Sequence, residues 1–131
     1  MPSIREPLGI VNIEAGLCKT SVIASKIDGI PEVITNNHSG ILIKPTKKII
    51  LDQHQDQPPI PDFVIDPDNY KMIAPKELDP KELSNKILFL SKNKKIRSKY
   101  ENHLYQHVKT HFLIKGYFEK IEKIYLNLSK D

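Results

Sequence analysis

The chain has 131 residues, of which 39% are hydrophobic and 27% are charged, a balance typical of one water-soluble domain with a modest core. Its formal net charge is +4. No apolar run reaches the roughly 18–20 residues of a membrane-spanning helix. The single cysteine excludes an internal disulfide. The N-terminal stretch lacks the apolar segment of a secretory signal, so the sequence predicts a cytoplasmic protein.

A turn and a short helix are predicted near the start of the chain. The tetrapeptide Glu6-Pro7-Leu8-Gly9 is typical of a turn, because proline fixes its own φ and glycine permits a tight backbone. The apolar residues that follow predict a short buried helix over residues 10–17. We interpret Cys18, directly after this helix, as a small core residue.

Two short strands are predicted next, over residues 21–25 and 41–43. A short helix over residues 31–35 separates them, because Pro31 suits the first turn of a helix. The order helix, strand, helix, strand indicates an α/β fold with a partial parallel sheet and short crossover helices. Residues 1–45 therefore form the core of the predicted domain.

Residues 46–78 are predicted to be an insertion or an irregular segment. Five prolines exclude a long helix here: Pro58, Pro59, Pro61, Pro67 and Pro75. A structureless loop of this length is unusual inside a compact domain. We therefore expect a small hairpin that pairs residues 49–51 with residues 63–65.

Residues 79–131 are predicted to form C-terminal helices of the same domain. Asp79 is a good N-cap, Pro80 suits the first helical position, and Glu82 completes a capping box. Two further helices follow, with a break or kink at Gly116. Helical spacing predicts three apolar stripes: Leu83, Ile87 and Leu90; Ile96, Tyr100, Leu104 and Val108; and Ile114, Phe118, Ile121, Tyr125 and Leu128.

Three histidines, His103, His107 and His111, recur every four residues and share one face of the second helix. Such spacing suits metal ligands, but no carboxylate or cysteine is placed to complete a site. The histidines also flank the apolar stripe. Half-buried edge residues are the favoured interpretation, and no metal is predicted.

Positive charge is concentrated in the C-terminal third, where residues 71–131 carry fourteen basic and seven acidic side chains. Solvated helix faces explain most such charge. Contact with an anionic membrane surface is the alternative, and would make the protein peripheral to a membrane. Nucleic-acid binding is disfavoured, because no aromatic residues interleave with the basic run.

Glu6 and Glu14 are the carboxylates with the clearest functional potential. Glu14 shares a helix face with Ile10 and Leu17, and a carboxylate that interrupts an apolar stripe must be paired or face a cleft. Ionised carboxylates accept paired hydrogen bonds, which vicinal sugar hydroxyls can donate. The alternative interpretation is that Glu6 caps the helix and Glu14 lies on its edge.

Backbone N–H groups near Leu8, Gly9 and Ile10 lie at the predicted N-terminus of the same helix. Such groups favour a phosphate, because they are unpaired and the helix dipole is positive there. A nucleotide-sugar requires carboxylates that bind its hydroxyl groups and, beside them, backbone amides that bind its phosphates.

The first third of the chain resembles the donor-binding core of family 4 glycosyltransferases, retaining enzymes built from two facing Rossmann-like domains (the GT-B fold). The matching elements are Glu6-Pro7-Leu8-Gly9, Glu14-Ala15, Val22–Ser25, Asp28-Gly29-Ile30-Pro31-Glu32 and Gly40–Pro45. The resemblance implies a partial Rossmann-like sheet and a C-terminal, nucleotide-sugar-binding half-domain.

By this resemblance, Glu6 would contact the ring hydroxyls of the donor sugar and Glu14 would hold the ribose. Backbone amides around Leu8, Gly9 and Ile10 would meet the sugar and the diphosphate. The resemblance assigns no general base to this chain and implies no metal or other cofactor.

The chain departs from the family pattern at two positions: Leu8 replaces an aromatic residue, and Asp28 replaces the first glycine of a Gly-Gly pair. In the family, an upstream arginine and lysine neutralise the diphosphate, and the acceptor site lies in an N-terminal domain. Neither is present here, so we expect a part of a longer hexosyltransferase that is inactive alone.

Two short strands are marginally stable by themselves, so either the insertion adds strands or copies of the chain associate to cover the exposed edges. The missing N-terminal domain of the same enzyme is a further expected partner. The alternative function is a non-catalytic interaction or assembly module that keeps the Rossmann-like fold.

Overall fold

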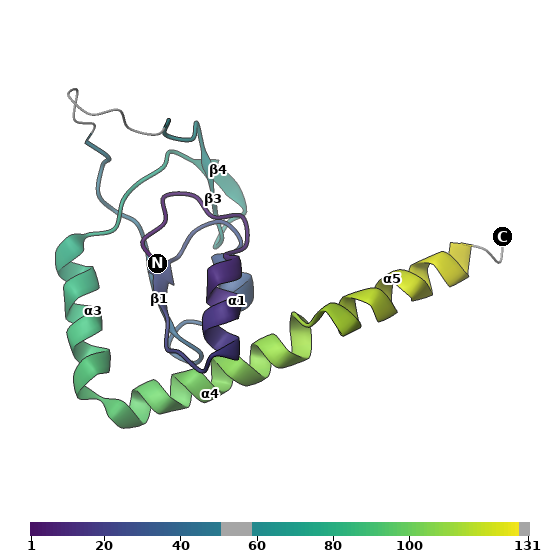
Figure 1. Ribbon diagram of the computed structural model, residues 1–131. Helices are drawn as coiled ribbons and strands as arrows, with labels where there is room; N and C mark the ends of the chain where they lie inside the picture. Colours follow the sequence, from purple (N-terminus) through teal and green to yellow (C-terminus); the bar gives the residue numbers. More distant parts are fainter. Residues whose placement is uncertain (51–58, 129–131) are drawn as a thin grey trace.

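The computed structural model describes residues 1–50 and 59–128 (Figure 1). Its elements in chain order are α1 (Ile10–Leu17), β1 (Ile23–Ser25), α2 (Ile30–Val33), β2 (Ile41–Ile43), β3 (Val64–Asp66), β4 (Lys71–Ile73), α3 (Pro80–Lys92), α4 (Lys94–His111) and α5 (Ile114–Leu128).

Strands β1 and β2 form a parallel pair, with Ile23 opposite Ile41 and Ser25 opposite Ile43. Helix α2 lies between them in the chain and provides the crossover that a parallel pair requires. The predicted α/β fold with a short parallel sheet is therefore confirmed.

Side chains alternate between the two faces of this sheet, as extended strands require. One face packs against α1, α2 and α4 through a buried cluster: Val22, Ala24, Ile27, Ile30, Val33, Ile34, Leu42, Val64, Leu104 and Val108. The other face packs against α3 and the first turns of α4 through a second cluster: Ile41, Ile43, Leu78, Leu90 and Tyr100. The sheet thus lies between two helical layers.

Helix α1 turns an unexpected side toward the core. Its buried residues are Asn12 and Gly16, whereas Ile10 is 65% exposed and Leu17 is 43% exposed. The close approach of α4 selects this side, because a Cβ at Gly16 would lie 2.9 Å from the side chain of Val108. The stripe that contains Ile10 and Leu17 therefore faces outward.

Cys18 is exposed, so its interpretation as a core residue is wrong. It is the C-cap of α1, and its N–H donates to the carbonyl oxygen of Glu14 at 3.0 Å.

The segment between β2 and α3 contains a different hairpin from the predicted one. Strand β3 pairs with β4, with Val64 opposite Ile73 in an antiparallel register. The prediction that residues 63–65 pair with residues 49–51 is therefore wrong, and Leu51 itself lies outside the described residues.

A tight turn explains this pairing. The N–H of Tyr70 donates to the carbonyl oxygen of Asp66 at 2.8 Å, and the N–H of Asp68 donates to the Asp66 carboxylate at 3.0 Å. Aspartate side chains favour such turns by bonding to the backbone two residues ahead. Closing this short loop costs less chain entropy than pairing with a more distant segment.

Helix α3 begins as predicted. The carboxylate of Asp79 accepts a hydrogen bond from the N–H of Lys81 at 3.0 Å, which confirms the N-cap. No reciprocal bond from Glu82 is formed within the described residues. Leu90 is buried but Ile87 is 52% exposed, so only part of the predicted stripe faces the core.

Helix α4 carries the predicted second stripe into the core, and its buried residues are Tyr100, Leu104 and Val108. The break that follows lies at Phe112 and Leu113, between α4 and α5, and the prediction of a break at Gly116 is wrong. Phe112 packs against the first buried cluster and holds the chain there. Gly116 lies inside α5, where no neighbour requires a bend.

Helix α5 extends away from the rest of the molecule (Figure 1). None of its residues is buried, although it carries the predicted third stripe. Its large exposed apolar residues include Ile114, Tyr117, Phe118, Ile124, Tyr125 and Leu128. Within the described residues, no helix is both long and apolar enough to cross a bilayer.

The contrast between α4 and α5 generates a stability prediction. Leu104→Ala removes a fully buried side chain and should lower the free energy of unfolding by about 2–5 kcal/mol in urea denaturation. Leu128→Ala, the same change at a side chain that is 68% exposed, should alter it by less than about 0.5 kcal/mol. Equal losses would contradict the core described above.

Candidate functional site

The loop before α1 is organised around Glu6. One oxygen of its carboxylate accepts a hydrogen bond from the N–H of Gly9 at 3.1 Å. Gly9 is the N-cap of α1 and has a φ of 85°, a left-handed conformation that glycine adopts without steric cost. The Gly9 amide is therefore bonded to Glu6, although the sequence predicted it to be free for a ligand.

Other amides at this helix end remain available. The N–H groups of Leu8 and Ile10 donate to no acceptor within residues 1–50 and 59–128. They lie at the positive end of the helix dipole, as the sequence predicts. This end of α1 can therefore accept an anionic group.

Glu14 lies on the outward face of α1. Its carboxylate forms no ion pair or hydrogen bond with any described residue, and its side chain is exposed. Ile10 and Val11, on the same helix, are 65% and 61% exposed. An unpaired carboxylate thus stands beside an exposed apolar surface next to the free amides, where it can accept hydrogen bonds from hydroxyl groups.

The turn after β1 holds the Glu6 loop in place. The carboxylate of Asp28 accepts hydrogen bonds from the N–H of Glu6 at 2.9 Å and from the N–H of Ile65 at 2.7 Å. The neighbouring Gly29 packs so closely that a Cβ there would lie 1.9 Å from the carbonyl oxygen of Pro7. Only glycine fits this contact.

Asp28 itself has a φ of 45°, so it adopts a left-handed conformation that costs a non-glycine residue roughly 1–2 kcal/mol. Hydrogen bonds to a charged acceptor contribute about 1.5–3 kcal/mol each, so the two bonds outweigh this cost. In the sequence, Asp28 stands out only as a departure from glycine. An aspartate at a turn that favours glycine was the available signal of an anchoring role.

A half-open hollow of about 280 Å³ adjoins this turn. The loop before α1, the turn after β1 and the β3–β4 hairpin line it together: Arg5, Pro7, Asp28, Gly29, Glu32, Ile65, Pro67 and Tyr70. None of the five predicted donor residues, Glu6, Leu8, Gly9, Ile10 and Glu14, is among its lining residues. The hollow therefore lies beside the predicted site, on the hairpin side.

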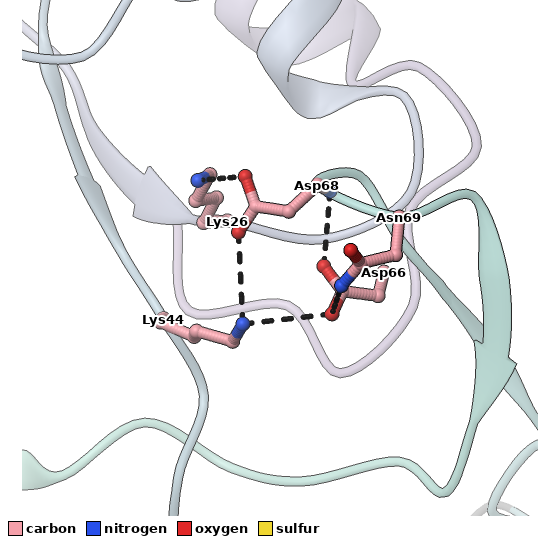
Figure 2. A network of polar contacts seen from close by, with 5 residues as sticks. All are labelled: Lys26, Lys44, Asp66, Asp68 and Asn69. Carbon is pink, nitrogen blue, oxygen red and sulfur yellow. Dashed lines mark hydrogen bonds and ion pairs between the residues drawn. The ribbon is translucent and has the colours of Figure 1, made fainter.

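Ion pairs fasten the hairpin to the ends of β1 and β2 (Figure 2). Lys26 is paired with Asp68, and Lys44 lies 3.5 Å from Asp66 and 3.6 Å from Asp68. The side-chain amide of Asn69 also donates to Asp66 at 3.2 Å. The hairpin is thereby fixed against the carboxyl end of the parallel sheet.

This network lowers the pKa values of its two carboxyl groups. The backbone N–H of Asp68 lowers the pKa of Asp66 from its ordinary value of 3.8, and Asn69 and Lys44 lower it further. The pKa of Asp68 is lowered mainly by its hydrogen bond from Lys26. Both carboxyls are therefore held ionised in the folded protein.

The histidines of α4 are engaged in structural contacts. His103 and His107 are half-buried, as predicted, and each ring donates to a backbone carbonyl: His103 to His38 at 3.1 Å and His107 to Glu32 at 3.0 Å. His111 is exposed, so the prediction fails there. Within the described part of the chain, no group of three His, Cys, Asp or Glu residues could hold a metal ion.

The first part of the chain is similar in sequence to a known protein family. Residues 1–52 match the sequence profile described as glycosyl transferases group 1. The chain is 55% identical over 42 residues to alpha-maltose-1-phosphate synthase of Mycolicibacterium smegmatis, covering 32% of this chain and 11% of that protein. It is 49% identical over 43 residues to D-inositol 3-phosphate glycosyltransferase of Streptomyces bingchenggensis, covering 33% of this chain and 10% of that protein.

The matched segment thus spans about a tenth of the length of these relatives. A solved structure extends the comparison to most of the fold. It is the C-terminal domain of a glycosyl transferase group 1 family protein from Francisella tularensis, with a TM-score of 0.57 and 22% identity. The similarity covers 86% of this chain and 42% of that one.

The ion-pair network generates a pH prediction. Because the pKa of Asp66 is lower in the folded than in the unfolded chain, its contribution to stability is present above about pH 4 and is lost as the pH falls through the folded pKa. Asp66→Asn should therefore destabilise the chain at pH 7 more than at pH 2.5, measured by thermal unfolding across that range. Asp62→Asn, the same change at an exposed residue just before β3, should leave the profile unchanged.

A pH profile for Asp66→Asn that parallels the parent chain would contradict the role assigned to this carboxylate.

Proposed function

Because this chain carries a segment of the glycosyltransferase group 1 family, we propose that it forms the half of the enzyme that binds a nucleotide-diphosphate sugar. In the intact enzyme, a hexosyl group would pass from this donor to a hydroxyl acceptor with retention of its anomeric configuration. The observation that carries the proposal is the outward face of α1, where an unpaired Glu14 carboxylate stands beside free amides at the helix N-terminus.

Each predicted donor residue has a defined role in this proposal. The amides of Leu8 and Ile10, and the backbone around Gly9, face the diphosphate at the positive end of the α1 dipole. Glu14 accepts hydrogen bonds from the ribose hydroxyls. Glu6 accepts hydrogen bonds from the sugar through the carboxylate oxygen that the Gly9 amide leaves free.

The residues of this chain bind and orient the donor, but the reaction also needs a cation to stabilise the departing diphosphate. Arg5 is the nearest basic residue to Glu6 in the sequence, and its guanidinium lies 5.5 Å from the centre of the Phe63 ring. The proposal therefore assigns the cations and the acceptor site to the N-terminal domain of the enzyme. The exposed face of α1 supports this arrangement, because Ile10 and Val11 leave an apolar surface for a facing domain.

The second candidate is a non-catalytic assembly module, and one observation favours it. Helix α5 carries an exposed apolar stripe along its length, as an association surface does. A second copy of the chain, or a membrane surface that attracts the basic C-terminal third, could cover such a helix. Donor binding separates the two candidates, because only the first requires a nucleotide-sugar.

Titration with UDP-, GDP- and ADP-sugars, followed by amide NMR, should perturb residues 6–14 for one of the three nucleotides. Glu14→Ala should weaken binding of that nucleotide-sugar and of its bare nucleoside diphosphate alike, by about tenfold, because ribose is common to both. Glu6→Ala should weaken only the nucleotide-sugar to this extent. Glu119→Gln on α5 is the charge-matched control and should change neither affinity.

An absence of response from residues 6–14 at millimolar concentrations of all three donors would contradict donor binding and favour the assembly module.

The purified chain should show no turnover of any nucleotide-sugar, either by transfer or by hydrolysis, because a donor held without a cation clamp or a positioned acceptor lacks the main sources of rate acceleration. Release of free nucleoside diphosphate, followed by chromatography over many hours, is the measurement. Steady release above that of a heat-denatured sample would show that the chain has a catalytic centre of its own.

A further inference from the structure

We propose that Asp28 is a positioning residue of the donor site, which sets the backbone of Glu6 and ties it to the β3–β4 hairpin. This inference rests on the proposed function, because it assigns Asp28 a part in donor binding. It adds a residue that does not touch the donor, and it makes the hairpin a support of the site.

The contacts of Asp28 carry the proposal. Its two carboxylate oxygens are divided between two segments: one accepts the N–H of Glu6 at 2.9 Å, and the other accepts the N–H of Ile65 in β3 at 2.7 Å. The N–H of Asp28 also donates to the carbonyl oxygen of Ile65 at 3.0 Å. One side chain therefore joins the turn after β1, the loop before α1 and the hairpin.

Neighbouring contacts leave the Glu6 loop little freedom to move. Gly29 lies directly against the carbonyl of Pro7, so the loop rests on the turn that carries Asp28. On its far side, the hairpin is fixed by the ion pairs of Lys26 and Lys44. The position of the Glu6 amide thus depends on a rigid turn and on a fastened hairpin, with Asp28 between them.

The placement of Glu6 has a direct consequence for binding. Its carboxylate already holds the Gly9 amide at 3.1 Å, so a shift of the Glu6 backbone moves both the carboxylate and the N-cap of α1. Donor groups that contact the carboxylate and the helix amides would lose their alignment together. A loosened loop must also be ordered again on binding, which lowers affinity.

Two substitutions isolate the Asp28 carboxylate. Asp28→Gly tolerates the φ of 45° but removes both acceptors. Asp28→Asn keeps the shape of the side chain and its tolerance of a left-handed backbone. It offers only one acceptor oxygen, and its NH2 group faces whichever of the Glu6 and Ile65 amides that oxygen does not accept. Asp62→Asn carries the same charge change as Asp28→Asn at an exposed position and serves as the control.

The first measurement is amide hydrogen exchange of the full chain by NMR. Asp28→Gly should accelerate exchange of both the Glu6 and Ile65 amides by at least about tenfold, and Asp28→Asn should accelerate at least one of them. Amides of the buried strand β2 should keep their parental exchange rates in both variants, which shows that the fold is intact. Unchanged exchange of the Glu6 amide in Asp28→Gly would overturn the proposal.

The second measurement is the affinity for the nucleotide-sugar that gives the strongest response in the parent chain. Asp28→Gly should weaken this affinity about fivefold or more, whereas Asp62→Asn should leave it unchanged. The exchange rates of the β2 amides should equal those of the parent chain in both variants. Rapid exchange of the Glu6 amide with an unchanged affinity would overturn the positioning role while leaving donor binding in place. No response of the parent chain to any donor would overturn the proposed function, and the positioning role with it.

Discussion

The contact between the Glu6 loop and the turn after β1 is the constraint on which the candidate site depends. Gly29 approaches the Pro7 carbonyl too closely for any side chain, and the adjacent Asp28 accepts the Glu6 amide. These contacts tie the loop to the carboxyl end of β1, and the loop in turn sets where α1 begins. The free amides of α1 and the two glutamates thus take their places from the turn after β1. When a packed turn fixes the first residue of a short helix, the binding groups on that helix are held in defined positions.

The two faces of the sheet are well covered, whereas other surfaces of the molecule are not. Buried clusters fill the space between β1, β2 and the helices on either side. The outward face of α1 and the length of α5, by contrast, expose large apolar side chains. Single exposed apolar residues are common on proteins, but a continuous stripe along a helix marks an association surface. Such surfaces support the proposal that this chain acts together with a facing domain.

Sequence patterns predicted the elements that local rules determine. The parallel strands, the Asp79 cap and the buried stripe of α4 all follow from spacing or from one residue's chemistry. Tertiary contacts decided the rest. The side of α1 that faces the core was set by the approach of α4 at Gly16, and a tight turn at Asp66 selected the partner of β3. The resemblance located Glu6 and Glu14, but the anchor at Asp28 depends on Ile65, whose contact across 37 positions has no signature in periodicity.

The direct test of the donor site at the N-terminus of α1 is a crystal structure of this chain soaked with a nucleoside diphosphate. We expect phosphate oxygens within hydrogen-bonding distance of the Leu8 or Ile10 amides, and ribose hydroxyls on the Glu14 carboxylate. The Glu6 amide should stay on Asp28, since the loop is set before the ligand arrives. A nucleotide bound elsewhere on the molecule, with the N-terminus of α1 empty, would contradict the claim that this helix is the donor site.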